Sequence, residues 1–293
     1  EIVGKPQWPP LGQPDWPAQI GISRADFHGI LAEAALSSGA KIRCGVTTRS
    51  IVSGEDHAAV TFTDGTSDTY DLVIGADGIY STIRSQIFPD FEGPAPTGQA
   101  IWRALARRPE GITTTQFHYG GPQGLVGICP INEDDCYLYC IHAGMPGERR
   151  DPATLHLQLR EKVKDYGGLV PGLADQLNDP ATVSYRPLER MLLPAPWYSG
   201  RIVLIGDAAH ANPPNVAQGA AMGIEDAVVL AEEISRPGPL ADALARFMER
   251  RWARVELVVD VSCRIAQAQV DHTPDFDAAA EIQRASEVLA QAY

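Results

Sequence analysis

The chain has 293 residues, of which 44% are hydrophobic and 21% are charged, and its formal net charge is -13. This length predicts about two domains, and the composition is typical of a globular protein without a membrane span. The negative charge argues against a nucleic-acid partner, because a duplex binder needs a basic surface to displace counterions from phosphates. Five cysteines without metal-type CxxC spacing, and an opening without a signal-peptide core, favour a reduced cytoplasmic setting and no metal site.

The first part of the chain reads as one helix followed by short strands. Ser23 is typical of a helix N-cap, the apolar residues after it lie near helical spacing, and Gly39 is a stop signal. The continuous apolar run Tyr70 to Gly75 is typical of a buried parallel strand. Three shorter strands are predicted before it, at Lys41 to Cys44, Thr47 to Val52 and Ala58 to Phe62.

Between residues 97 and 193 the pattern changes to alternating, strand-like stretches interrupted by one helix. The predicted elements there are strands at Ala100 to Ala106, Thr113 to Tyr119, Gly124 to Cys129 and Cys136 to His142, and a helix at Pro152 to Tyr166. A second buried parallel strand, Arg201 to Ile205, follows. Helices are then predicted at Gln218 to Ile234, Leu240 to Gln269 and Phe276 to the end.

These elements predict an α/β fold, with an incomplete Rossmann-like domain, an inserted and mainly antiparallel sheet domain, and C-terminal helices. We expect residues 1–96 to form the first part of the Rossmann-like domain. Residues 97–193 are expected to form the inserted domain, and residues 194–293 the second part with the C-terminal helices.

Two segments share one design, in which an apolar strand ends in a glycine and an aspartate. The first delivers Asp77 and Gly78 to the carboxyl edge of the sheet, where ligands bind in open α/β folds. The second delivers Asp207, whose carboxylate suits a ribose or ribityl hydroxyl. A proline loop then leads to small residues that open a long helix, and such an N-terminus offers unpaired N–H groups to an anionic ring or a carbonyl oxygen.

With these motifs the sequence resembles the FAD-dependent aromatic hydroxylases, the single-component family that includes hydroxybenzoate and salicylate hydroxylases. The second segment is similar to the family's GDAAH motif, with its proline, its GQG and its Glu-Asp-Ala. The first is similar to the Asp-Gly motif with a trailing Ser81 and Arg84, and Arg24 resembles an arginine that lies near the flavin. Trp102-Arg103 resembles a strand opening of the family's substrate domain.

The resemblance implies FAD as cofactor and NAD(P)H as reductant. It implies that Asp207 holds the ribityl chain, that Pro214 lies by the isoalloxazine, and that the amides of Ala220 and Ala221 face its N1, O2 and N3 edge. Asp77 and Arg84 are implied near the cofactor phosphates or the NAD(P)H path. The full set of cofactor-binding positions implied in this way is Arg24, Asp77, Gly78, Arg84, Asp207, Pro214, Ala217, Gln218, Gly219, Ala220 and Ala221. Ala217 departs from the first glycine of GQG, which matters only if that position needs a positive φ.

The sequence contains no GxGxxG, the loop with which the family binds the ADP pyrophosphate. We therefore expect a truncated chain that, as given, holds FAD weakly or not at all. The strand missing from the sheet would leave an edge that favours a homodimer.

The implied reaction is hydroxylation of a small aromatic substrate with O2 and NAD(P)H. Its pocket residues are expected on the inserted sheet, among His118, Tyr119, Tyr139, His142 and Tyr185, and no catalytic base is assigned. Two alternatives stay open: a cofactor-free folded remnant that binds at most a small aromatic ligand, and a flavoprotein of the same fold that does not hydroxylate.

Overall fold

The computed structural model of the chain describes residues 20–121 and 124–292, with the side chains of residues 119 and 120 outside the description. The chain forms two compact units. The first comprises Glu1–Ile42, Gly98–Leu188 and Ala268–Pro274, and the second comprises Arg43–Thr97, Glu189–Gln267 and Asp275–Tyr293. Within the described residues, no helix combines the length and apolar character that crossing a bilayer requires.

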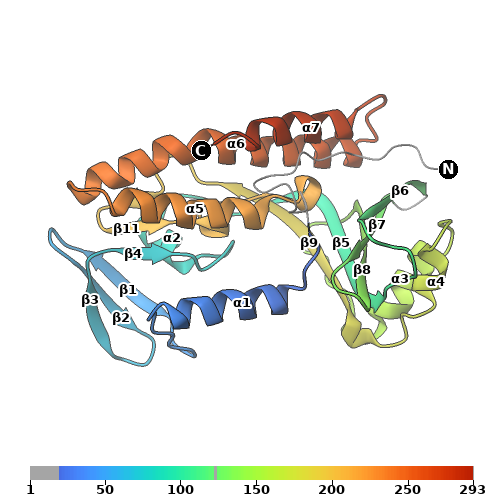
Figure 1. Cartoon of the computed structure of the whole chain (residues 1–293), viewed down its shortest axis with the longest axis horizontal. Helices are drawn as coiled ribbons and strands as arrows, with labels where there is room; N and C mark the ends of the chain where they lie inside the picture. The colour runs from blue at the N-terminus through green and yellow to red at the C-terminus, as the bar shows by residue number, and fades with distance from the viewer. Residues whose placement is uncertain (1–19, 122–123, 293) are drawn as a thin grey trace. The chain divides into compact units, whose positions relative to one another are not determined.

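The first unit is built on antiparallel strands that lie in the order β9-β5-β8-β7-β6 (Figure 1). Its elements are α1 (Arg24–Ser37), β5 (Ala95–Arg107), β6 (Gln116–Gly121), β7 (Gly124–Pro130), β8 (Asp135–Ala143), η1 (Pro152–Thr154), α3 (Leu155–Val163), α4 (Val170–Ala174), η2 (Pro180–Thr182) and β9 (Val183–Leu192). Strands β5 and β9 each continue for a few residues into the second unit. The inserted antiparallel sheet that the sequence predicted is therefore present.

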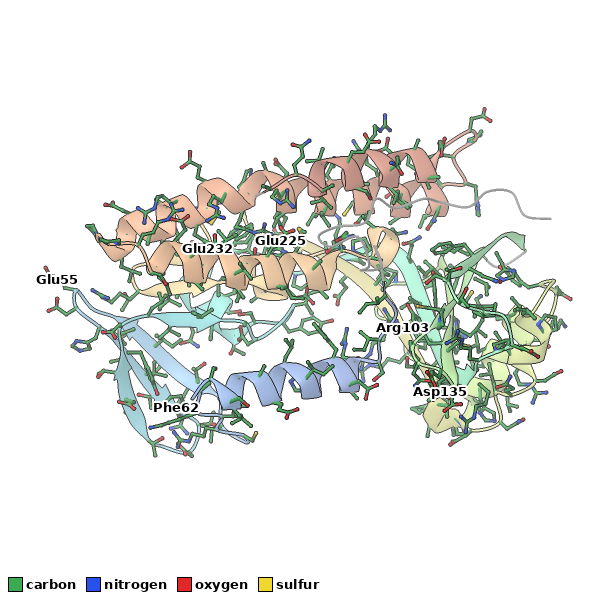
Figure 2. The ribbon with its side chains drawn as sticks, in the orientation of Figure 1. Glu55, Phe62, Arg103, Asp135, Glu225 and Glu232 are labelled. Atoms are coloured by element: carbon green, nitrogen blue, oxygen red, sulfur yellow. The ribbon has the colours of Figure 1, made fainter. Side chains whose placement is uncertain are left out.

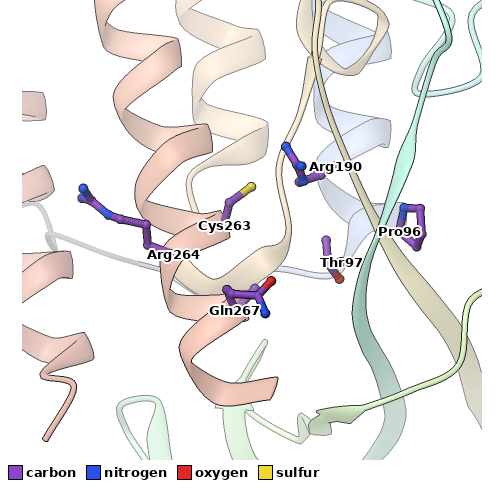
Figure 3. A pocket seen from close by; sticks show the side chains of 7 residues that line it. Pro96, Thr97, Arg190, Cys263, Arg264 and Gln267 are labelled. Atoms are coloured by element: carbon purple, nitrogen blue, oxygen red, sulfur yellow. The ribbon is translucent and has the colours of Figure 1, made fainter. Parts of the chain in front are cut away.

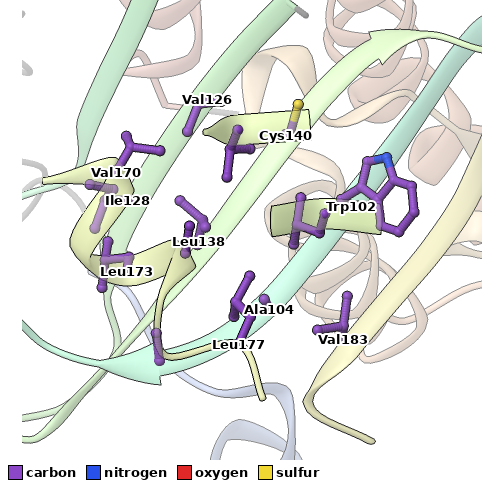
Figure 4. Close-up of a cluster of buried hydrophobic side chains, with 14 of the residues drawn as sticks. Trp102, Ala104, Val126, Ile128, Leu138, Cys140, Val170, Leu173, Leu177 and Val183 are labelled. Carbon is purple, nitrogen blue, oxygen red and sulfur yellow. The ribbon is translucent and has the colours of Figure 1, made fainter. Parts of the chain in front are cut away.

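One face of this sheet packs against α3 and α4 and forms the main core of the first unit. Trp102, Val126 and Leu138 project from neighbouring strands toward Leu159 and Leu173 of these helices, and all five are almost fully buried (Figure 4). Side chains of a strand alternate between its two faces, so the residues between these positions point the other way. Removing this much apolar surface from water is what fixes the strand register.

The opposite face, which we call the tyrosine face, carries a smaller cluster. Ile101, Tyr139 and Ile141 are buried there and pack with Tyr137 and Leu188. By the same alternation Arg103 on β5 and Arg186 on β9 belong to this face. The tyrosine face is thus apolar and aromatic, and it also carries arginines.

The second unit contains two small sheets and the long helices. Its elements are β1 (Thr48–Ser53), β2 (Ala58–Phe62), β3 (Ser67–Tyr70), β4 (Val73–Gly75), α2 (Thr82–Ile87), β10 (Tyr198–Ser199), β11 (Ile202–Leu204), η3 (Gly206–Ala208), β12 (His210–Ala211), η4 (Pro214–Val216), α5 (Gly219–Ile234), α6 (Leu240–Val270) and α7 (Ala278–Leu289). One sheet has the order β1-β2-β3, the other β10-β11-β4, and β12 pairs with the end of β9.

The two strands predicted to be parallel and buried do lie side by side, since β4 and β11 pair in parallel. Helices α5 and α6 run along this sheet (Figure 1), and Trp197, Val203 and Phe247 form its fully buried core. Because β4 and β11 are parallel, the loops that leave their carboxyl ends emerge at the same edge. Both aspartate motifs are on those loops.

Several predicted boundaries are confirmed and some are wrong. Ser23 caps α1 by accepting a hydrogen bond from the Asp26 amide at 3.0 Å. The strand predicted at Lys41 to Cys44 does not form: Ile42 is 52% exposed, Cys44 is exposed, and Gly45 turns the chain with φ of 74°. Without buried apolar surface, a run this short has nothing to stabilise it as a strand.

Candidate functional site

The Asp-Gly turn after β4 is held together by the carboxylate of Asp77. Its Oδ2 accepts hydrogen bonds from the amides of Thr82 at 2.8 Å and Ile83 at 3.2 Å, and its Oδ1 accepts one from the Ser81 hydroxyl at 2.5 Å. Gly78 has φ of 83°, a conformation that favours glycine. Asp77 thus caps the start of α2 from an exposed position. A role toward a cofactor phosphate stays a prediction.

Arg84 joins the two motif loops. Its Nη2 donates to the Ile79 carbonyl at 2.8 Å and its Nη1 to the Ala208 carbonyl at 2.9 Å, while its guanidinium lies 5.8 Å from the centre of the Phe91 ring. Arg84 is 4% exposed, and this burial lowers its pKa, with the charge of Asp77 acting in the opposite direction. The structure therefore places Arg84 as a buried clamp between the two loops. A role near the cofactor phosphates or the NAD(P)H path stays a prediction.

The Gly-Asp turn after β11 is packed directly against helix α5. Gly206 has φ of 57°, and a Cβ at Gly223 would lie 3.5 Å from the Gly206 Cα. Two glycines thus let the helix backbone approach the turn closely. Asp207 is exposed at the tip of this turn, whereas the next residue, Ala208, is fully buried.

A buried ionic network lies beneath this turn. Asp226 of α5 accepts hydrogen bonds from the Gly206 amide at 2.8 Å, from His210 Nε2 at 2.6 Å and from Arg251 Nε at 2.8 Å. Glu225 pairs with Arg251 and, at 3.0 Å, with Arg254 (Figure 2 labels Glu225). The sequence showed Glu225 and Asp226 as a motif but gave no sign of their partners on α6.

The charge state of Asp226 follows from these contacts. Burial favours the neutral acid, but the hydrogen bond and charge of His210, the charge of Arg251 and the Gly206 amide together hold the pKa of Asp226 below its usual value. Asp226 is therefore an ionised carboxylate that fixes the backbone of the Gly-Asp turn. It positions Asp207 without touching the solvent side of the turn.

The N-terminus of α5 lies next along the chain and is lined by small residues. Gln218 precedes the helix without a side-chain cap, and Ala220 is exposed in the first turn. The first amides of a helix have no partner within the helix, so this end offers hydrogen-bond donors and a positive dipole end. Ala217, before it, has φ of 58°, the left-handed conformation that glycine would adopt at lower cost.

A buried acceptor lies beside these donors. Asn212 Oδ1 has no hydrogen-bond partner among the described residues, and it lies 3.1 Å from the position that a Cβ at Gly219 would take. A buried polar atom without a partner is costly unless a ligand or water satisfies it. Donors next to an acceptor suit a flat heterocycle whose edge carries both, so the residues present fit the ring end of a flavin.

The candidate substrate residues do not share one face of the inserted sheet. Tyr139 lies on the tyrosine face, 5.2 Å from Tyr137 between ring centres. His118 lies near Gly168, which precedes α4, and Tyr185 packs against the core beneath the helices. The side chain of Tyr119 lies outside the described residues. One pocket on a single face of the sheet cannot therefore contain Tyr139 together with His118 and Tyr185.

The residues on the helical face are held by their own contacts. The Tyr185 hydroxyl donates to Glu148 at 2.5 Å, and Arg150 stacks over the Tyr185 ring at 4.8 Å. His142 accepts a hydrogen bond from Trp102 Nε1 at 3.0 Å. Burial lowers the pKa of His118, whose Nε2 has no partner among the described residues. A substrate role for each of these residues stays a prediction.

Arg24 begins α1 and interacts electrostatically with Arg103 of the tyrosine face. Burial lowers the pKa of Arg103, Tyr137 opposes this, and the positive charges of Arg24 and Arg186 lower it further. The three arginines come from three separate elements of the first unit, α1, β5 and β9. The sequence did not indicate that their charges act on one another.

A pocket of about 290 Å³ lies elsewhere in the second unit (Figure 3). It is lined by Pro96, Thr97, Arg190, Cys263, Arg264, Ala266 and Gln267. None of the predicted cofactor or substrate residues lines it. The pocket is therefore separate from the aspartate turns at the strand ends and from the predicted substrate residues on the inserted sheet.

Two aspartate turns at one edge of a parallel sheet, a helix N-terminus of small residues and an antiparallel sheet unit define an α/β protein of the flavin-binding class. A family model described as an FAD binding domain matches residues 13–262. The chain belongs to this family, that of the FAD-dependent aromatic hydroxylases.

Named relatives agree with this assignment. The chain is 34% identical over 245 residues to 2-heptyl-3-hydroxy-4(1H)-quinolone synthase of Pseudomonas aeruginosa, which covers 82% of this chain and 62% of that protein. It is 28% identical over 253 residues to 3-hydroxybenzoate 6-hydroxylase 1 of Aquipseudomonas alcaligenes, which covers 81% and 61%. The chain thus spans less than two thirds of the length of these two relatives.

Solved structures share the fold. The crystal structure of Klebsiella pneumoniae HpxO complexed with FAD and uric acid matches with a TM-score of 0.78 at 24% identity, over 90% of this chain and 68% of that one. Pseudomonas aeruginosa PqsL, described as a probable FAD-dependent monooxygenase, matches with a TM-score of 0.70 at 18% identity, over 89% and 71%. At this identity the match concerns the fold.

Proposed function

We propose that the protein to which this chain belongs is a flavin-dependent monooxygenase that hydroxylates a small aromatic substrate with NAD(P)H and O2. The observation that carries the proposal is the Gly-Asp turn, where Asp226 and His210 hold the backbone that presents Asp207 beside the α5 N-terminus. Membership in the hydroxylase family supports it. When bound, FAD would supply the redox and oxygen chemistry.

The chain's own residues have separate tasks in this proposal. Asp207 would accept hydrogen bonds from ribityl hydroxyls, and Pro214 would lie against the ring. The amides of Ala220 and Ala221, with the dipole of α5, would stabilise negative charge on the ring edge. Asn212 would accept a hydrogen bond from a ring N–H, which would satisfy its buried oxygen.

The Asp207 assignment is tested by FAD binding, with flavin fluorescence and thermal unfolding of the chain as readouts. We expect weak binding, because these 293 residues contain no GxGxxG to hold the pyrophosphate. Asp207→Ala should weaken it by about 1 to 3 kcal/mol, the scale of a charge-assisted hydrogen bond. Asp56→Ala, in the exposed hairpin between β1 and β2, is the matched control and should change nothing. Equal FAD affinity in the chain and in Asp207→Ala would exclude this role.

Turnover tests the reaction itself. Oxygen consumption that depends on NAD(P)H and yields hydroxylated product in equal amount supports the proposal. Flavin reduction without a hydroxylated product would instead identify a non-hydroxylating flavoprotein. A folded chain that shows no response to FAD would leave the cofactor-free remnant as the better description.

The assembly belongs to the same proposal. Among the strands of residues 20–121 and 124–292, β4 ends its sheet in the order β10-β11-β4, and Ile74 on it is 44% exposed. An open strand edge with exposed apolar surface favours pairing with another chain. We therefore expect a homodimer, which sedimentation at several protein concentrations would detect and a constant monomer mass would contradict.

A further inference from the structure

Helix α7 ends against an arginine of α6. Arg254 is 8% exposed, and its guanidinium donates to the Leu289 carbonyl at 2.9 Å and to the Gln291 carbonyl at 3.2 Å. The last carbonyls of a helix have no partner within the helix and form the negative end of its dipole, so a cation is favourable there. Arg254 therefore caps the end of α7 from a neighbouring helix.

The same guanidinium also contacts helix α5. Its Nε donates to Glu225 Oε2 at 3.1 Å and its Nη2 to Glu225 Oε1 at 3.0 Å, a paired geometry that fixes the orientation of both side chains. An ion pair that water can reach contributes little, whereas one that α7 keeps from water is stronger. The contact of Arg254 with α7 therefore helps to hold Glu225 in place.

Glu225 connects this arginine with the Gly-Asp turn. It pairs with Arg251, which is fully buried and donates to Asp226 Oδ1 at 2.8 Å. Asp226 accepts a hydrogen bond at 2.8 Å from the amide of Gly206, the residue before Asp207. Four charged side chains of alternating sign thus link the end of α7 to the backbone of the turn, and all of them lie in the second unit.

Apolar packing holds α7 in place independently of Arg254. Helix α7 runs along part of α6 (Figure 1). Val216, two residues after Pro214, lies in a buried cluster whose other fully buried members are Val261 and Ile265 of α6 and Ala285 of α7. A change at Arg254 leaves this cluster intact, so we expect such a variant to stay folded.

We propose that Arg254 is a positioning residue for cofactor binding, because it couples the end of α7 to the turn that presents Asp207. This inference rests on the flavin-dependent function proposed above, since FAD is the ligand that the turn would hold. A turn that is already rigid loses less conformational freedom when a ligand binds. Capping of α7 and binding of FAD therefore favour each other.

The first test needs no cofactor. Hydrogen exchange at the Gly206 amide, measured by NMR on the isotope-labelled 293-residue chain, reports how often the turn opens. Arg254→Gln should speed this exchange by about three- to tenfold, less than the full loss of a hydrogen bond to a charged group, because the effect is indirect. The Leu204 amide, which donates to the Trp197 carbonyl at 2.8 Å, should change much less. Equal acceleration at both amides, or none at Gly206, would overturn the proposal.

Matched variants assign the effect to the route through Glu225. Arg264 also joins α6 to α7, since it pairs with Glu281 at 2.6 Å, but among residues 20–121 and 124–292 none of its salt bridges reaches α5. Arg264→Gln should therefore leave exchange at Gly206 unchanged. Arg254→Lys should recover part of the protection, because the charge beside Glu225 remains without the planar fork. Exchange in Arg264→Gln as fast as in Arg254→Gln would refute a specific role of Arg254.

FAD binding, followed by flavin fluorescence, extends the test to the cofactor. Arg254→Gln should weaken FAD binding by about three- to tenfold, as the coupling requires. FAD should also slow exchange at the Ala290 amide, which donates to the Ser286 carbonyl at 2.9 Å at the end of α7, in the parent chain but not in Arg254→Gln. A purely structural role of Arg254 would not produce this FAD-dependent signal.

The two sets of measurements separate the two proposals. If the parent chain binds FAD, an equal affinity in Arg254→Gln together with an Ala290 exchange rate that ignores FAD would overturn the role of Arg254. If Arg254→Gln speeds exchange at Gly206 but the parent chain never binds FAD, the coupling is supported and the proposed function alone is refuted.

Discussion

The two units contain buried or half-buried arginines in opposite circumstances. In the second unit Arg251 is fully buried, and its donors meet Asp226 and Glu225. In the first unit Arg103 lies beside two further positive charges and no described carboxylate pairs with it. The arrangement around Arg251, which we call the supporting frame, is therefore complete within the protein. Around Arg103, the described residues leave the positive charge without a paired carboxylate.

The same distinction separates residues within the motifs. The resemblance implies that Asp77 and Arg84 lie near a cofactor, which stays a prediction, and in the structure Asp77 caps α2 while Arg84 ties two loops together. Asp207 is exposed at its turn while Asp226 below it is fully buried. The Gly-Asp motif thus contains both an exposed carboxylate, proposed to face the cofactor, and a buried one that holds the turn in place.

The largest effect is expected from breaking the frame. Asp226→Asn removes the charge between Arg251 and His210 and should lower the free energy of unfolding by about 3 to 5 kcal/mol, the usual cost of leaving a buried ion without its partner. Urea unfolding measures it. Asp260→Asn is the control, because Asp260 pairs with Arg264 at the surface and should cost less than about 1 kcal/mol. A similar loss of unfolding free energy in both variants would show that the buried network stabilises the fold no more than a surface ion pair does.

A smaller, pH-dependent loss of stability is expected at His142 of the first unit, whose two ring nitrogens both have hydrogen-bond partners while the ring is neutral. His142 Nδ1 is 2.5 Å from the Ala143 carbonyl, and its Nε2 accepts from Trp102, so both nitrogens are used in the neutral form. Burial, with the charge of Lys162, lowers the pKa of His142 from 6.5 to about 4. Because the folded-state pKa is depressed, the stabilisation is complete above pH 6.5 and is lost as the pH falls toward 4.

Unfolding measured from pH 7 to pH 4 should therefore show an acid-dependent loss of at most about 3 kcal/mol that His142→Gln lacks. The exposed His57, replaced in the same way, should leave the pH profile of the parent chain unchanged. A His142→Gln variant with the parent's pH profile would mean that folding does not lower the pKa of His142.

The smallest change in the free energy of unfolding is expected at the strained loop residue before α5. Ala217 has φ of 58°, so Ala217→Gly should raise the free energy of unfolding by up to about 1 kcal/mol, the strain relieved less the extra freedom of the unfolded glycine. Ala220→Gly, in the first turn of α5, should lower it by about 0.5 to 1 kcal/mol. Thermal unfolding of the two variants measures both changes in the free energy of unfolding. If both variants are destabilised, the loop at Ala217 carries no strain.

Local patterns in the sequence predicted most of the fold. Periodicity and end signals placed α1, α5 and α6 within a few residues, and the two apolar runs predicted the parallel pair β4 and β11. Strand β9 was not predicted, because Pro187 and its charged residues interrupt any regular alternation. Its existence depends on pairing within the sheet.

The candidate site was predicted less completely, for a related reason. The GDAAH and GQG resemblance led to Asp207, Pro214 and the α5 N-terminus, and the doubt over Ala217 proved relevant because that residue does adopt a positive φ. The electrostatic effect of Arg186 on Arg103 depends on strand order, and the contact of Asp226 with Arg251 depends on helix packing. Neither leaves a local pattern in the sequence.

The contacts of Arg84 also have a consequence for anyone who exchanges parts between flavoproteins. Because one guanidinium bonds to the backbone carbonyls of Ile79 after β4 and of Ala208 after β11, the positions of the two loops are linked. A chimera that takes one loop from a relative keeps both bonds only if the new loop places its carbonyl where the old one was, whereas a chimera that takes both loops together with α2 keeps the whole arrangement.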